Sequence, residues 1–165
     1  MPEIMTRDFG PIRYSEAEVF HFAGGMPGFG DCLSFLTVRP DPAGPLVVLQ
    51  SLERPEVAFL TVPVEALAID YQLRMVEADV RALGATSTAG LHALVIITLP
   101  AHGPGTVNLL GPIVLHQGTR RGVQAIREDN RYRAAEPAEA LLSHAAGAAD
   151  SPRAAQAEKE CASCS

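Results

Sequence analysis

Two runs of nearly uninterrupted apolar residues, 46–51 and 91–99, constrain the fold of this 165-residue chain more than any other feature. Each run has the length of one strand and is bounded by proline or glycine, so each predicts a strand that is buried on both faces. A strand this apolar at the edge of a sheet would pair with other chains and aggregate. We therefore expect both runs to lie inside a strongly curved or closed sheet.

The rest of the chain adds short strands at close spacing, separated by turns rich in glycine and proline. Further strands are predicted at residues 3–8, 12–14, 18–22, 33–38, 57–62, 71–75, 112–116 and 123–127. One short helix is predicted at 77–83, with Gly84 as its C-terminal cap. This pattern indicates an all-β, mainly antiparallel fold, either a sandwich or a small β-barrel that is closed or nearly closed.

A change in composition near residue 134 predicts the end of this domain. We expect a β-barrel domain over residues 1–135 and an alanine-rich polar tail over 136–165. Residues 137–145 could form a turn or two of helix. Residues 146–165 offer few large apolar side chains and are predicted to be disordered.

The charge of the chain limits the kinds of partner it can bind, and its targeting and cysteine patterns indicate where it acts. The net charge is −6 and Lys159 is the only lysine, which argues against direct nucleic-acid binding as the main role. Residues 119–133 nevertheless contain five arginines against two acidic residues, so partners of either sign can be accommodated. No signal peptide and no membrane-spanning run are visible, and the cysteine pattern is not a disulfide framework, so we expect a cytoplasmic protein.

A search for reactive side chains yields no catalytic constellation, and we expect neither enzymatic activity nor a cofactor. No nucleophile is placed beside a base, and Cys32 reads as a small buried residue at a strand start. Cys161 and Cys164 have the spacing of half a zinc site, but the chain offers no second pair, only His144 or Cys32. A metal- or redox-responsive module built on these cysteines, and a barrel that holds a small ligand, stay open as alternatives.

Two groups of residues can be interpreted either as structural or as part of a binding site. The loop over residues 24–30 contains Gly25, Pro27, Gly28 and Phe29, and lacks the lysine of a phosphate-binding loop, so we expect it to be structural. The amides of Gln50, Asn108 and Gln124 sit among apolar strand residues. Such amides either satisfy irregular backbone near strand ends or contact a partner.

Three segments in order resemble the FliW family of flagellar assembly factors. They are Phe22-Ala-Gly-Gly-Met-Pro-Gly-Phe29, Leu49-Gln-Ser-Leu-Glu-Arg-Pro-Glu-Val-Ala-Phe59, and the stretch from Val95 through Val107-Asn-Leu-Leu-Gly-Pro-Ile113 to Gly122-Val-Gln124. The resemblance covers roughly residues 5–135. It implies a non-enzymatic antiparallel β-barrel that binds flagellin and the translational repressor CsrA, and that relieves repression of flagellin translation when flagellin is exported.

The interaction surface is predicted in the region 106–127 and in the turn that follows Gln50. The predicted contact residues are Gln50, Phe59, Asn108, Leu110, Gln124 and Arg127. A loop that is rich in Asp and Glu in the family is here Ala101-His-Gly-Pro-Gly105, so partner preference can differ at that point.

Overall fold

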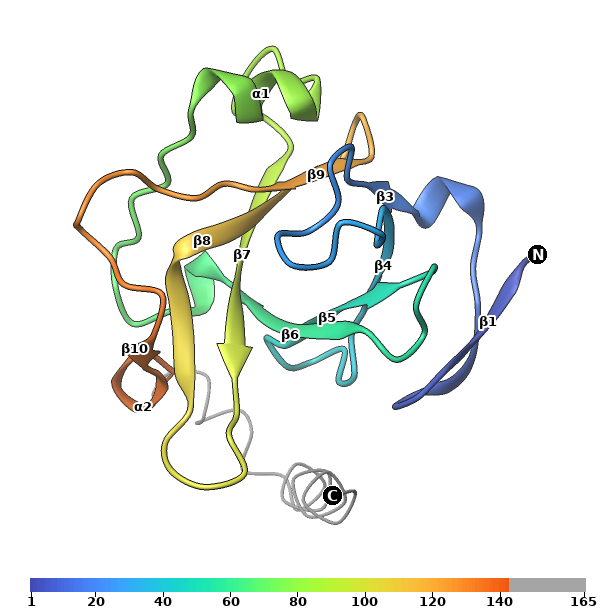
Figure 1. Ribbon diagram of the computed structural model, residues 1–165, viewed down its shortest axis with the longest axis horizontal. Helices are drawn as coiled ribbons and strands as arrows, with labels where there is room; N and C mark the ends of the chain where they lie inside the picture. Colours follow the sequence, from blue (N-terminus) through green and yellow to red (C-terminus); the bar gives the residue numbers. More distant parts are fainter. Residues whose placement is uncertain (143–165) are drawn as a thin grey trace.

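The computed structural model describes residues 1–142 and consists mainly of short strands (Figure 1). The strands are β1 (Glu3–Thr6), β2 (Gly10–Arg13), β3 (Phe20–His21), β4 (Ser34–Val38), β5 (Val47–Ser51), β6 (Ala58–Pro63), β7 (Leu91–Thr98), β8 (Thr106–His116), β9 (Arg121–Gln124) and β10 (Glu136–Pro137). The α-helices are α1 (Glu77–Leu83) and α2 (Ala138–Leu141). Among the described residues, no helix is long and apolar enough to cross a bilayer.

Strands β3 to β9 close into a barrel. Neighbouring strands follow the order β8-β7-β6-β5-β4-β3-β9, and pairing of β9 with β8 completes the ring. All of these pairs are antiparallel except β3 with β9, which are parallel through His21 and Arg121. The predicted closed, mainly antiparallel β-barrel is therefore confirmed.

The two apolar runs form strands that are paired with a neighbouring strand on both sides, as their composition predicted. Strand β5 lies between β4 and β6, and β7 lies between β6 and β8. Every residue of β5 is buried. Neither run forms an exposed edge, which explains how such apolar strands are tolerated.

The barrel interior is filled by large side chains rather than left as a cavity. Phe20, Phe22, Phe35, Leu49 and Ile113 belong to one buried cluster. Phe22 and Phe35 meet edge to face, with ring centroids 5.0 Å apart. A core packed in this way weighs against the alternative of a barrel that holds a small ligand.

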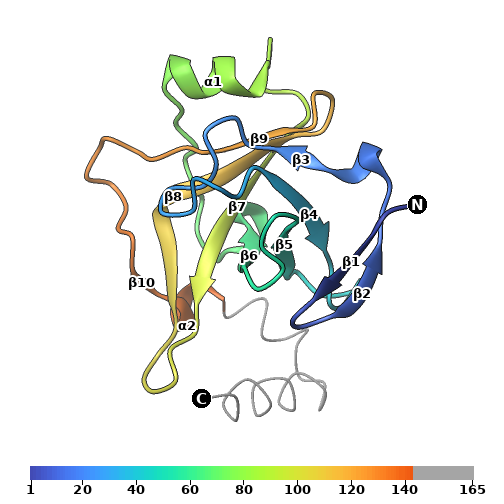
Figure 2. The ribbon, with the colours of Figure 1, turned by 45° about the vertical axis from the view of Figure 1, so that its right-hand side comes forward.

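Three separate groups of elements pack on the outside of the barrel. Helix α1 places Leu83 on Val114 and Ala125, and its Gly84 cap has φ = 64°, which confirms the predicted helix and its glycine stop. The β1–β2 hairpin covers Leu36 with Ile4. Strand β10 pairs with β8 beside helix α2, on the side of the barrel away from α1 (Figure 2).

Some predicted strands are wrong or have different bounds. Residues 71–75 are not a strand, because their polar groups bond to distant side chains: the Tyr132 hydroxyl accepts from the Gln72 N–H, and Arg127 donates to the Gln72 carbonyl. The strand predicted at 18–22 is confined to β3, because Ser15 and Glu18 form a capping box around a 3₁₀ turn, Glu16–Glu18. The strand predicted at 112–116 instead begins at Thr106.

The chain packs on the barrel beyond residue 135. Pro137 pairs with Thr106, and Ala138 is buried against Val107 and its neighbours. The predictions for residues 143–165, including disorder over 146–165, lie outside the described residues.

Candidate functional site

One end of the barrel interior brings together Phe59, Ile96 and Asn108. Phe59 lies two residues from Thr61 on β6, Thr61 pairs with Ile96 of β7, and Ile96 pairs with Asn108 of β8. Cross-strand partners share one face of a sheet, so these side chains all point toward the interior. Each is partly exposed, unlike the buried cluster beneath them, so they line the opening of the barrel.

The glycine-rich loop covers part of this opening and adds an aromatic ring to it. Met26 inserts from the loop into the buried core, and Phe29 stays partly exposed with its ring centroid 5.2 Å from that of Phe59. Gly25 and Gly28 have φ of 69° and 83°, and a Cβ on Gly25 would lie 2.9 Å from the Gly30 backbone. The loop therefore needs its glycines to fold back over the core.

The amides of Asn108 and Gln124 hold a bulge in β8. Here Val95 of β7 stands opposite residues 109–112. Asn108 Oδ1 accepts from the Gly111 N–H at 3.0 Å, and Gln124 Nε2 donates to the Gly111 carbonyl at 2.9 Å. Asn108 Nδ2 and Gln124 Oε1 make no hydrogen bond within the described part of the chain. One donor and one acceptor are thus available to a partner.

The antiparallel pairing of β8 and β9 continues beyond the bulge, into the segment that follows β9. The Arg127 N–H donates to the Leu110 carbonyl, so the ladder between β8 and β9 continues past Gln124. Ile126, two residues beyond Gln124 and on the same side of this segment, is 50% exposed. Leu110 is partly exposed, and its N–H donates to the Arg133 carbonyl.

These residues form one surface at the end of the barrel. We call it the barrel mouth, and it consists of Phe29, Phe59, Ile96, Asn108, Gln124 and Ile126. Sequence reasoning missed Ile96, because it lies in an apolar run that indicates only core. It included Ile126 only as part of the region 106–127, without naming it as a contact residue. Only the register, which places Ile96 opposite Asn108, identifies its position.

Gln50 is fully buried and positions a turn instead of reaching the surface. Its Nε2 donates to the Pro55 carbonyl at 2.9 Å and to the Ser51 carbonyl at 3.0 Å. Its Oε1 has no hydrogen-bond partner among residues 1–142. The turn so held carries Arg54, which lies 6.0 Å from the Phe29 ring centroid and pairs with Glu56. A direct contact between Gln50 and a partner would require this turn to open, so the predicted contact stays a prediction.

Arg127 is also buried, and it joins two irregular segments. Its guanidinium binds both carboxylate oxygens of Asp129, at 2.9 and 2.6 Å, and lies 4.8 Å from the ring centroid of Tyr132. Tyr132 in turn stacks on Tyr71, with centroids 4.6 Å apart. The hydrogen bonds from Arg127 lower the pKa of Asp129, and the same bonds raise the pKa of Arg127. Arg127 is therefore buried behind the mouth, and its predicted contact with a partner stays a prediction.

No group of three or more His, Cys, Asp or Glu side chains within residues 1–142 could hold a metal ion. Cys32 is buried, and its Sγ lies 3.9 Å from Asp31 Oδ1. The weak metal candidates Cys161 and Cys164, and His144, lie outside the described residues.

The fold defines the chain as a small β-barrel whose interior is filled by side chains. Its sequence matches the FliW protein family over residues 3–138. It is 29% identical over 134 residues to the flagellar assembly factor FliW of Syntrophotalea carbinolica, covering 81% of this chain and 95% of that protein. It is 31% identical over 132 residues to the FliW of Caldanaerobacter subterraneus subsp. tengcongensis, covering 79% of this chain and 88% of that protein.

The fold agrees with this likeness. A crystal structure of the flagellar assembly factor FliW superimposes with a TM-score of 0.76 at 25% identity, covering 82% of this chain and 96% of that chain. The chain belongs to the FliW family of flagellar assembly factors, which are not enzymes.

Proposed function

We propose that this protein acts in the cytoplasm by binding flagellin and a CsrA-type translational regulator at the barrel mouth. Flagellin occupies the protein until it is exported, and the freed protein then binds the regulator and relieves repression of flagellin translation. Membership of the FliW family supports the assembly role, and the resemblance of the sequence motifs supports the two partners. The acidic net charge of −6 suits a regulator whose RNA-binding surface is basic.

The observation that carries the site is the set of unused groups at the mouth. Asn108 Nδ2 and Gln124 Oε1 belong to the same surface as the partly exposed Phe29, Phe59 and Ile126. Protein interfaces are built from apolar and aromatic anchors with a few oriented polar groups at their edge. Because the two amides are fixed by Gly111, little conformational entropy is lost when a partner binds them.

A titration with purified partners tests the proposal. Ile126→Ser removes an exposed anchor at the mouth, and Met5→Ser removes another exposed apolar side chain, from the β1–β2 hairpin, as a control. We expect the Ile126 variant to bind at least one partner about tenfold more weakly, the loss of one interface anchor, with an unchanged melting temperature. The Met5 variant should bind like the wild type.

A competition experiment tests the shared site. Protein saturated with flagellin should not bind the regulator, and added free protein should restore binding. If neither partner bound at roughly 50 μM, the proposed function would be refuted. Equal effects of the two variants would refute the mouth as the site and leave the function standing.

A further inference from the structure

Strand β3 is too short to cover its neighbour β4. Its two residues pair only with Ser34 and Phe35, whereas β4 continues to Val38. Before β3, the chain turns away in the 3₁₀ turn that the Ser15 capping box fixes. Within the described part of the chain, residues 36–38 therefore have a strand on only one side.

The main chain of Thr37 faces the uncovered side. The Leu52 N–H donates to the Ser34 carbonyl, so the main-chain groups of Ser34, and of every second residue after it, point to β5. Those of Thr37 point the other way. The β3–β4 register would place Glu18 opposite Thr37, but the Glu18 N–H donates to Ser15 at 2.9 Å. Thr37 thus presents a donor and an acceptor with no partner among the described residues.

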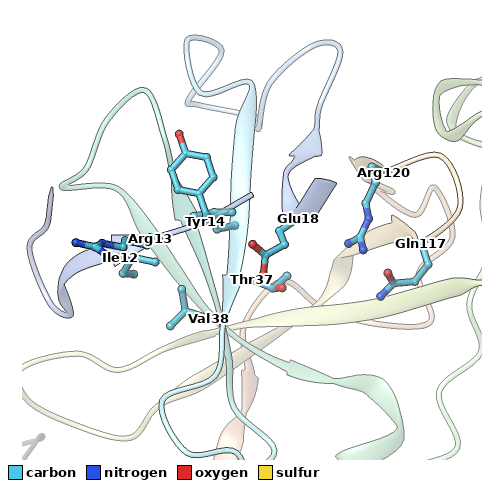
Figure 3. Close-up of a pocket in the computed structure, with 9 residues that line it drawn as sticks. Ile12, Arg13, Tyr14, Glu18, Thr37, Val38, Gln117 and Arg120 are labelled. Atoms are coloured by element: carbon cyan, nitrogen blue, oxygen red, sulfur yellow. The ribbon is translucent and has the colours of Figure 1, made fainter. Parts of the chain in front are cut away.

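A polar groove of about 280 Å³ lies along this edge. Figure 3 shows Gln117 and Arg120 on one side of Thr37, and Arg13 and Tyr14 on the other. None of the residues that line it belongs to the barrel mouth.

Arg120 brings an unpaired positive charge to the groove. Its guanidinium carbon lies 4.8 Å from the centroid of the Phe20 ring, and no carboxylate among the described residues pairs with it. Its main chain is fixed by the His21 N–H, which donates to the Arg120 carbonyl at 2.8 Å, and it has φ = 53°. The one carboxylate that lines the groove, Glu18, already accepts from the Ser15 N–H at 2.7 Å. A guanidinium that rests on an aromatic ring and has no carboxylate partner among the described residues favours a carboxylate from outside.

We propose that this groove binds an extended acidic segment of a partner protein by strand addition to β4. The Thr37 N–H donates to a carbonyl of the segment, and the Thr37 carbonyl accepts from one of its N–H groups. A Glu or Asp side chain of the same segment forms a bidentate pair with Arg120. This site is separate from the mouth, so the protein can hold an extended segment while the mouth is occupied.

Amide NMR of the isotope-labelled full chain tests the proposal. The probe is the peptide acetyl-Val-Glu-Val-Thr-amide, compared with its Gln analogue and with an analogue that is N-methylated on the backbone. We expect saturable shifts at Thr37, Val38 and Arg120, about tenfold weaker binding of the Gln analogue, and no binding of the N-methylated one.

A variant of the protein completes the test. Arg120→Asn removes the charge while asparagine tolerates the left-handed backbone at this position. It should bind the Glu and Gln peptides equally, whereas Arg81→Gln, which alters an exposed arginine on α1, should keep the preference. The melting temperature of each variant checks folding. Three results would each overturn the proposal. The first is equal binding of the Glu and Gln peptides to the wild type, and the second is shifts confined to the mouth. The third is concentration-dependent shifts at Thr37 without peptide, which would indicate a second copy of the chain as the occupant.

Discussion

Replacing Gly122 with alanine tests how tightly the barrel interior is packed around Phe22. A Cβ at this position would lie 2.5 Å from Phe22 Cε2, would also overlap Cζ, and would lie 2.9 Å from Leu115 Cδ2. Carbon atoms normally approach to about 3.5–4.0 Å, so the ring must move by about 1 Å. Phe22 is only 1% exposed and rests edge-on against Phe35, so it has little room to move. We expect a loss of about 2–3 kcal/mol in the free energy of unfolding, at the upper end for an overpacked core.

Urea denaturation of the full chain measures this loss, with Gly24→Ala as the matched control. An added Cβ on Gly24 meets nothing within 4 Å, so that variant should stay within about 0.5 kcal/mol of the wild type. Phe22→Leu should relieve the overlap, and the double variant Phe22→Leu/Gly122→Ala should lose at least about 1 kcal/mol less than the sum of the single losses. Additive losses, or a Gly122 variant as stable as the Gly24 variant, would show that the interior is not packed as described.

Two further predictions concern the buried arginine behind the mouth. Arg127→Met should lower the free energy of unfolding by about 2–3 kcal/mol in urea denaturation, because it leaves the Gln72 carbonyl without this donor and removes the bidentate pair with Asp129. The exposed Arg131→Met should change it by less than about 0.5 kcal/mol. The pKa of Asp129 is lowered in the folded state, so its contribution to stability is present above its ordinary value of 3.8 and is lost as pH falls through the folded pKa. Thermal unfolding of the wild type between about pH 5 and pH 2 should show this loss. The loss should be smaller in the Arg127→Met variant, where the Arg131 N–H and the charge of Arg74 still act on Asp129. Equal acid sensitivity of the two proteins would contradict the assigned pair.

The fold was largely predictable because its main signals are local. Two apolar runs imply inner strands, and the helix ends at Gly84 because glycine reaches φ = 64° without strain. The missing strand at 71–75 was not predictable in the same way. Its polar groups are satisfied by Arg127 and Tyr132, which are 55 and 60 residues away in the chain. A segment whose partners are distant side chains carries no local sign of that pairing.

The candidate site was predictable only in part, for a related reason. The amides of Asn108 and Gln124 stand out as polar groups within apolar strands, and the structure brings both to Gly111. Gln50 and Arg127 stand out equally in the sequence, but both are buried. Sequence pattern identifies a polar group that needs partners; only the register and the burial decide whether those partners lie within the chain.

Asn108 and Gln124 link the shape of the mouth to its binding groups. Each amide uses one atom to hold the bulge at Gly111 and leaves the other atom unpaired within the described part of the chain. A Cβ on Gly111 would lie 2.8 Å from Gln124 Nε2, so even alanine there would displace the amide. Substituting either amide therefore alters the bulge and the contact together, and a loss of binding would not separate them. Ile126 makes the distinction possible, because it is 50% exposed at the same surface and takes no part in holding the bulge.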